Sequence, residues 1–211
     1  MKGILFKEEM YKVILAGKKS QTRRTVKQPK NSYGIQVSKN KDGLVTGVYA
    51  YDADESTIKP GTDDEWQILP RYKVGETLYL KEPYLDNQSD WGIPQPDGTY
   101  IKYKFDNFLP VKKWKNKLFM PERCARAFIK ITDVTCERLS QISGEDCFKE
   151  GIQEYTKDSI IRLYKYGVEG SEWDDIPDRP VQAYQDLWNS INGPESWNQN
   201  PFVFVYTFEK I

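Results

Sequence analysis

The chain has 211 residues, in which 31 Lys and Arg balance 31 Asp and Glu, and 38% of residues are hydrophobic. It contains no apolar run of about 18 residues, and the apolar stretch at its N-terminus is too short for a signal peptide, so we expect a cytoplasmic protein without a membrane span. The chain has no histidine, which excludes Ser-His-Asp triads, Cys-His pairs and His-metal sites. Any acid–base chemistry must therefore come from Lys, Asp, Glu, Tyr or Cys.

The three cysteines, Cys124, Cys136 and Cys147, are widely spaced and form no CxxC pair. This spacing argues against a zinc site and against a disulfide framework. We expect all three to be small buried hydrophobic residues.

Positive charge is concentrated in two stretches. Residues 1–30 hold nine Lys or Arg against two Glu, and residues 102–130 hold nine against one Asp and one Glu, so the rest of the chain is acidic. This distribution indicates a local positive patch for an anionic partner such as nucleic acid, or else two solvated surface segments.

The N-terminal part begins with a predicted strand over residues 3–6 and a predicted helix over residues 7–16. Acidic residues in the first turn favour this helix, and Gly17 ends it. Residues 27–70 have the composition of an insertion. Within it, Lys41-Asp-Gly43 between two apolar segments predicts a hairpin.

In the middle of the chain, alternation of apolar and polar residues predicts strands over residues 77–81, 100–105 and 127–134. Residues 86–110 contain a loop rich in Gly, Pro and Asp, and we interpret them as a second insertion.

Two helices and a strand are predicted in the C-terminal part. Ser143 opens a capping box for a short helix that Gly151 ends. Residues 153–177 are polar and predict an irregular third insertion. Residues 180–192 form the clearest helix pattern, and residues 202–208 alternate as a half-buried strand does.

The predicted strands do not alternate regularly with helices, which disfavours a doubly wound sheet. We expect one α+β domain over residues 1–211, built as a small antiparallel β-barrel with peripheral helices and the three insertions.

Residues 15–24, Leu-Ala-Gly-Lys-Lys-Ser-Gln-Thr-Arg-Arg, are the strongest candidate for a functional centre. A partly desolvated lysine crowded by Arg23 and Arg24 has a lowered pKa, so Lys19 is a candidate general base. Thr22 is then a candidate nucleophile, as in Ser-Lys arrangements. The same cluster is also typical of a solvated helix end or of a phosphate contact.

Several motifs resemble the ASCH domain family of the PUA-like superfamily, in the longer form carried by phages and prophages. They cover most of the chain outside the three insertions. The matching segments are Gly3-Ile-Leu-Phe6, Leu15-Ala-Gly17, Lys19-Ser-Gln-Thr-Arg-Arg24, Arg71-Tyr-Lys-Val-Gly-Glu-Thr-Leu-Tyr-Leu-Lys-Glu82, Phe119-Met-Pro121 with Arg123 and Arg126, Glu137-Arg-Leu139, Glu145-Asp-Cys-Phe-Lys-Glu-Gly-Ile152, and Leu187-Trp-Asn-Ser-Ile-Asn-Gly193 through Asn200-Pro201 to the last strand.

The resemblance implies a PUA-like β-barrel with a cleft beside the first helix, in a superfamily whose members recognise RNA or modified bases. Some compact ASCH proteins are amidohydrolases that deacylate N4-acetylcytidine with a Lys, a Thr and a Glu. That pattern falls on Lys19, Thr22 and Glu150. Lys19 then takes the proton of Thr22 as it attacks the acyl carbonyl, and Glu150 holds Lys19 or protonates the leaving amino group. Arg23 or Arg24 stabilises the oxyanion, and the reaction needs no metal or cofactor.

Four further residues are candidates for ligand contacts. Glu82, at the end of a predicted strand, could pair with an arginine of the basic motif in the same cleft, or form a structural ion pair. Lys112, Lys113 and Trp114 combine charge with one aromatic ring, a composition typical of phosphate contacts with a stacked base and also of a solvated loop.

The sequence therefore supports three functions. The first is a module that binds RNA or a modified nucleoside, with Arg23, Arg24 and residues 112–117 on the phosphates. The second is an N4-acetylcytidine amidohydrolase. The third is a metal-independent ribonuclease with Lys19 and Glu150 as base and acid. A purely structural role leaves the basic cluster without explanation.

Overall fold

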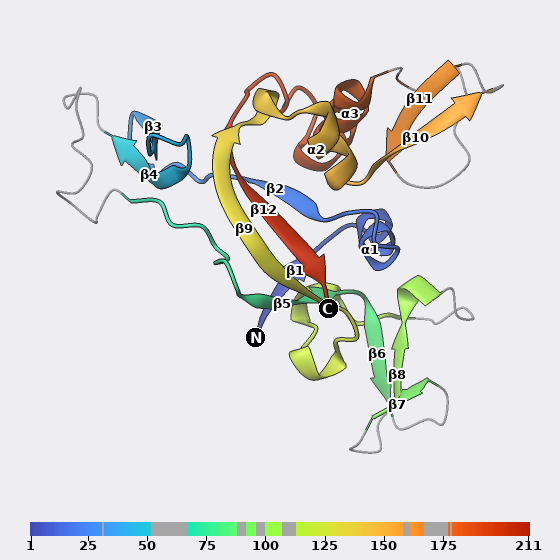
Figure 1. Cartoon of the computed structure of the whole chain (residues 1–211). Helices are drawn as coiled ribbons and strands as arrows, with labels where there is room; N and C mark the ends of the chain where they lie inside the picture. Colours follow the sequence, from blue (N-terminus) through green and yellow to red (C-terminus); the bar gives the residue numbers. More distant parts are fainter. Residues whose placement is uncertain are drawn as a thin grey trace.

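Figure 1 shows the computed structural model of the chain. The structure describes residues 1–30, 32–51, 67–87, 92–95, 100–106, 113–157, 161–166, 177 and 179–211. Within these residues it is an α+β protein, in which strands predominate over helices.

A five-stranded sheet in the order β1-β5-β9-β12-β2 organises the molecule. Its strands are β1 (Lys2–Leu5), β2 (Gln21–Thr25), β5 (Thr77–Lys81), β9 (Phe128–Arg138) and β12 (Phe202–Lys210). The β1–β5 pair is parallel, and the other three pairs are antiparallel. β9 and β12 are long, curved and side by side in Figure 1, so they connect the two ends of the molecule.

Strand β12, which lies between β9 and β2, is covered on both faces. Successive side chains of a strand point to opposite faces, which places Val203 and Val205 on one face and Phe204 and Tyr206 on the other. All four side chains are buried. The elements that cover the two faces therefore form one continuous core with the sheet.

The described strands do not close into the expected barrel. β1 and β2 are the edges of the sheet, and no backbone ladder joins them within the described ranges. Instead, the Arg24 side chain on β2 donates a hydrogen bond of 2.9 Å to the carbonyl oxygen of Leu5 at the end of β1. A side chain bridges these edges where a barrel would have a ladder, and open space is left on both sides of the bridge.

The three helices lie close to their expected positions. α1 (Glu8–Leu15) joins β1 to β2, and α3 (Pro180–Asn192) precedes the last strand. α2 (Gly144–Lys149) begins with the expected cap, because the Ser143 side chain accepts a hydrogen bond of 3.1 Å from the Asp146 amide. No described helix has the length and apolar character needed to cross a membrane.

The first two insertions form small sheets. β3 (Gly34–Lys39) and β4 (Val45–Tyr51) pair as the expected hairpin. β6 (Tyr84–Asn87), β8 (Tyr100–Tyr103) and β7 (Ile93–Pro94) form a three-stranded sheet. Short 3-10 turns, which the sequence pattern did not show, are η2 (Lys104–Asp106), η3 (Lys117–Phe119), η4 (Glu122–Cys124) and η5 (Leu139–Gln141).

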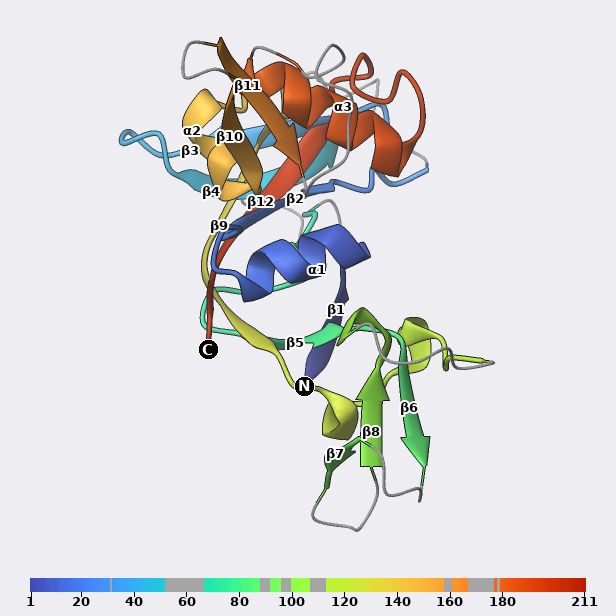
Figure 2. The same cartoon turned by 90° about the vertical axis from the view of Figure 1, so that its right-hand side faces the viewer.

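The third insertion differs from the expectation of an irregular segment. β10 (Ile152–Lys157) and β11 (Ile161–Tyr166) form an antiparallel hairpin beside α3. Ile152, Leu163 and Tyr166 are buried, whereas polar residues occupy most other positions. The hairpin forms because these few side chains pack on the core, a tertiary effect that local composition does not show. In Figure 2 the hairpin, α2 and α3 gather at one end of the sheet, with the three-stranded sheet at the other.

The three cysteines are buried, as expected. Burial raises the pKa of both Cys136 and Cys147 to about 12. These two thiols therefore stay protonated at neutral pH and are not nucleophiles.

Candidate active site

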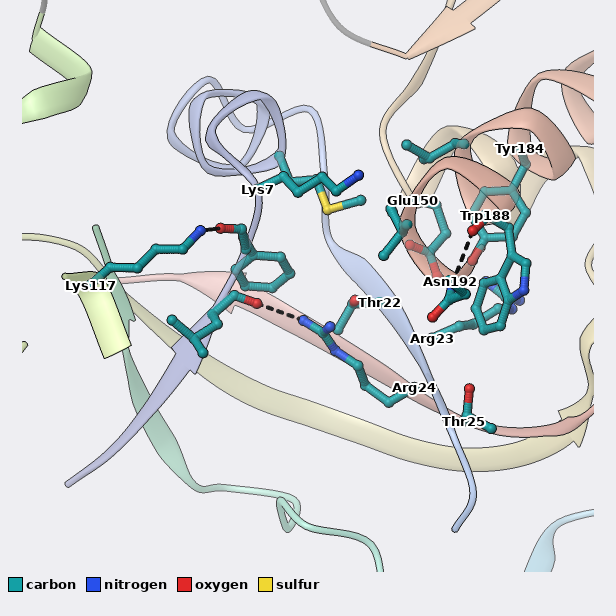
Figure 3. A pocket seen from close by; sticks show the side chains of 15 residues that line it. Lys7, Thr22, Arg23, Arg24, Thr25, Lys117, Glu150, Tyr184, Trp188 and Asn192 are labelled. Atoms are coloured by element: carbon teal, nitrogen blue, oxygen red, sulfur yellow. Dashed lines mark hydrogen bonds and ion pairs between the residues drawn. The ribbon is translucent and has the colours of Figure 1, made fainter. Parts of the chain in front are cut away.

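A cavity of about 260 Å³ lies beside β2, near the gap between the two edge strands. Figure 3 shows Thr22, Arg24 and Thr25 along β2 in its wall. Glu150 and Trp188 approach from the side of α2 and α3, and Lys7 and Lys117 lie on the opposite side.

Two loops that follow helices bring Lys19 and Glu150 together. Gly17 follows α1 with a positive φ of 70°, and Glu150 is the C-cap residue that follows α2. The Ser20 amide donates to the carbonyl oxygen of Lys149 at 2.9 Å, which ties the two loops to each other. As a result, Lys19 Nζ lies 2.6 Å from Glu150 Oε2 and 2.7 Å from the Glu150 carbonyl oxygen.

The surroundings of Lys19 favour the neutral amine more than water does. Its side chain is fully buried, and burial lowers the pKa of Lys19, against the opposing influence of the Glu150 carboxylate. A neutral amine has two N–H bonds, and the two oxygen atoms of Glu150 accept both. The nitrogen lone pair takes no part in these two hydrogen bonds, so neutral Lys19 can accept a proton while it keeps both of them.

Arg23 lines the cavity, but its guanidinium is paired with carboxylates. It contacts Glu137 at 2.7 Å, Glu150 at 3.1 Å and Asp146 at 3.3 Å, and its side chain has no exposed surface. Three acidic neighbours compensate its charge, so Arg23 is less suited than Arg24 to contact a phosphate or an oxyanion. Arg23 instead fixes the Glu150 carboxylate from the side opposite Lys19, and the Tyr184 hydroxyl interacts with the same carboxylate.

Thr22 lines the cavity together with Glu150. It is 4% exposed, and among the described residues its hydroxyl has no hydrogen-bond partner. Lys19 does not line the cavity itself, but the carboxylate of its partner Glu150 does. The structure thus brings Thr22 and Glu150 to one wall, with Lys19 behind Glu150.

Arg24 also lines the cavity, and it carries no ion pair in the described part of the chain. Besides its hydrogen bond to Leu5, its guanidinium lies 5.2 Å from the centre of the Phe6 ring. These two contacts fix the side chain between β1 and β2 and leave most of its N–H donors unused.

Glu82 lies elsewhere, which corrects the expectation that it pairs with Arg23 or Arg24. It is fully buried and accepts hydrogen bonds from Tyr11 and, at 2.7 and 2.9 Å, from Arg126. It follows β5, which β9 and β12 separate from β2 in the sheet. Glu82 therefore forms the structural ion pair that was the other interpretation of this residue.

The predicted basic run of residues 112–117 reaches the cavity through Lys117 and not through the described candidates at its start. Lys112 lies outside the described residues, and neither Lys113 nor Trp114 lines the cavity. Lys117 does, and its Nζ donates a hydrogen bond of 2.6 Å to the carbonyl oxygen of Phe6. Burial lowers the pKa of Lys117, against the influence of Glu8.

Sequence reasoning missed the residues that give the cavity its apolar character. Met10, Leu187 and Trp188 line it, and their helical spacing equally fits a core position. No signal in the sequence separates a side chain that lines a cavity from one that is packed on all sides.

Comparison of the chain with family models, curated protein sequences and solved structures gives no match. No group of three potential metal ligands occurs among the residues described.

Proposed function

We propose that the protein is an amidohydrolase that removes an acyl group from the exocyclic amino group of a nucleoside such as N4-acetylcytidine. The observation that carries the proposal is the buried Lys19–Glu150 pair next to a cavity in which the Thr22 hydroxyl has no partner among the described residues. Lys19 and Glu150 are 131 residues apart in the chain, and they are the two ionisable residues that the ASCH resemblance indicates. We assign the fold as a PUA-like barrel that Arg24 bridges between β1 and β2.

The reaction uses groups that the site already holds. Neutral Lys19 takes the proton of the Thr22 hydroxyl as its oxygen bonds to the acyl carbonyl carbon. The C–N bond to the base then breaks, and Lys19 returns the proton to the leaving amino group. Water then attacks the acyl-threonine ester while Lys19 takes one of its protons. The ester C–O bond breaks, Lys19 gives this proton to the Thr22 oxygen, and the carboxylic acid leaves, so that Thr22 and neutral Lys19 are both restored. Glu150 keeps Lys19 in place through the whole cycle.

The charge that develops on the acyl oxygen needs a donor in the cavity. Arg24 is suited to this role because it lines the cavity and carries no ion pair within the described segments. β2 is also an edge strand, so part of its backbone N–H groups face the gap and not a neighbouring strand. Donors held in advance in a dry site stabilise an oxyanion strongly.

The cavity suits a small, uncharged ring. Its volume of about 260 Å³ is at the lower end for small-molecule sites. Phe6, Met10 and Trp188 supply apolar surface, and the charge of Arg23 is compensated. Lys7, Arg24 and Lys117 also line the cavity, and each donates to a backbone carbonyl oxygen. The apolar surface suits a nucleobase with a short acyl group.

The test is the release of cytidine from N4-acetylcytidine by the purified protein, followed by chromatography. Thr22→Val keeps the shape and the β-branched character of the side chain but removes the nucleophile, so we expect a loss of turnover of at least about 10³-fold. Thr25→Val is the matched control, because Thr25 lines the same cavity and has no role in the reaction. Equal turnover by Thr22→Val and the wild type would overturn the proposal.

A further inference from the structure

A second and larger cavity, of about 530 Å³, lies on the other side of the Arg24 bridge. Leu5, Arg24 and Thr25 line both cavities, so the two spaces share one wall. Thr22 in the first cavity is three strand residues from Thr25, about 10 Å at the usual rise of a strand. A ligand of nucleotide size can therefore reach from one cavity into the other.

The second cavity differs from the first in that no carboxylate is found among its described lining residues. Arg24, Lys27 and Arg71 line it. None of these three cations forms an ion pair in the part of the chain that the structure describes. Lys7, Arg24 and Lys117 line the first cavity as well, but there Glu150 contributes a negative charge and Arg23 is neutralised.

The fold holds one of these cations in place. The Arg71 amide donates a hydrogen bond of 3.1 Å to the Tyr206 hydroxyl, and the Arg71 guanidinium lies 5.4 Å from the centre of the Tyr72 ring. Tyr72, Phe204 and Tyr206 are all buried and form the floor of the cavity. Uncompensated cations on an apolar floor favour an anion attached to an organic group over a freely hydrated ion.

We propose that the second cavity is the subsite for a phosphate group of the same molecule whose acylated base occupies the first cavity. This inference rests on the proposed function and narrows its substrate class from nucleosides to nucleotides. Lys27 and Arg71 contact the phosphate, and Arg24 lies between it and the base. The phosphate belongs either to a nucleoside monophosphate or to an RNA strand, because both place it one ribose away from the base.

The experiment compares the binding of cytidine, cytidine 5′-monophosphate and the trinucleotide UpCpU by calorimetry, with wild type and with Lys27→Gln/Arg71→Gln. Both side chains are exposed, so the double variant should fold, and Lys41→Gln in the β3–β4 turn is the control for a lost surface charge. We expect at least one phosphorylated probe to bind about tenfold or more tightly than cytidine, since hydrogen bonds to charged groups are each strong. The double variant should lose this advantage, and Lys41→Gln should keep it.

The two phosphorylated probes distinguish the sources. Tighter binding of the monophosphate indicates a free nucleotide, and tighter binding of the trinucleotide alone indicates an RNA strand. Equal affinity for all three probes, or an advantage that the double variant retains, would overturn the inference. A phosphate advantage without hydrolysis of any acylated cytidine would overturn the proposed function and leave the subsite standing, whereas hydrolysis without the advantage would do the reverse.

Discussion

Two clusters in this protein each contain a buried carboxylate that is paired with cations. One of them includes a lysine, and in the other the cation is an arginine. The lysine cluster consists of Lys19, Arg23 and Glu150, and the arginine cluster consists of Tyr11, Glu82 and Arg126. Glu150 is 2% exposed and Glu82 is fully buried. Only the lysine cluster contributes residues to the cavity beside β2.

The difference separates a cluster that can exchange a proton from one that cannot. Arg126 makes two hydrogen bonds to Glu82, a third to Asp106, and stacks 4.0 Å from the centre of the Tyr103 ring. An arginine stays protonated under all ordinary conditions, so this cluster has a fixed charge. Burial lowers the pKa of Lys19, which makes its neutral form accessible. We therefore interpret the arginine cluster as structural and the lysine cluster as chemical.

Exchanging the two cations gives the largest expected effect. Lys19→Arg keeps a positive charge beside Glu150 but cannot act as a base, so hydrolysis should fall by about 10²- to 10⁴-fold. Arg126→Lys should lower stability and leave the rate per folded molecule unchanged. The measurement is the steady-state rate of hydrolysis by each variant, divided by the concentration of folded protein and compared with the wild type. Equal losses of rate in both would contradict the division into chemical and structural clusters.

Removing the buried carboxylate of the arginine cluster should be costly for stability alone. Glu82→Gln leaves the Arg126 charge poorly compensated, and breaking a buried pair costs about 3–5 kcal/mol in the free energy of unfolding. Urea denaturation measures this loss. Glu122→Gln, which removes a half-exposed partner of the Met1 amine, is the control and should cost under about 1 kcal/mol. A similarly small effect of Glu82→Gln would refute the structural role.

A smaller effect is expected from the tyrosine of the arginine cluster. Tyr11→Phe removes the hydroxyl that donates to Glu82, and the loss of a hydrogen bond to a charged group should lower the free energy of unfolding by about 1.5–3 kcal/mol. Tyr33→Phe, at a side chain that is 72% exposed, should leave stability unchanged. If the denaturation curves of Tyr11→Phe and Tyr33→Phe coincide, the Tyr11 hydroxyl does not contribute to the stability of the protein.

Much of the fold could be predicted from the sequence because its signals are local. The cap at Ser143, the helix over residues 180–192 and the β3–β4 hairpin each depend on neighbours in the chain. The β10–β11 hairpin could not be predicted, because its few apolar residues stabilise it only when they pack near α3 in the folded protein. The barrel expectation did not foresee that a side chain, Arg24, joins β1 to β2 where no ladder forms.

In the candidate site, too, the features that depend on local sequence could be predicted, whereas most of those that depend on the tertiary fold could not. A lysine near a helix end suggested chemistry by its type, and the resemblance to a family indicated its distant partner Glu150. The pairing of carboxylates with cations depends on the order of the strands in the sheet. This order places Glu82 beside Arg126 and away from the basic motif. The second cavity was not predicted, because Arg71 and Lys27 are 44 positions apart and carry no shared pattern.

The most direct test of the central claim is the pH dependence of N4-acetylcytidine hydrolysis. In the proposed mechanism neutral Lys19 is the active form, and burial lowers its pKa from the ordinary value of 10.5. The rate should therefore rise about tenfold per pH unit through a single ionisation and level off before pH 10.5. The residual rate of Lys19→Arg should lack this ionisation. A rate that does not change with pH, or the same profile in Lys19→Arg, would contradict the role of Lys19 as the base.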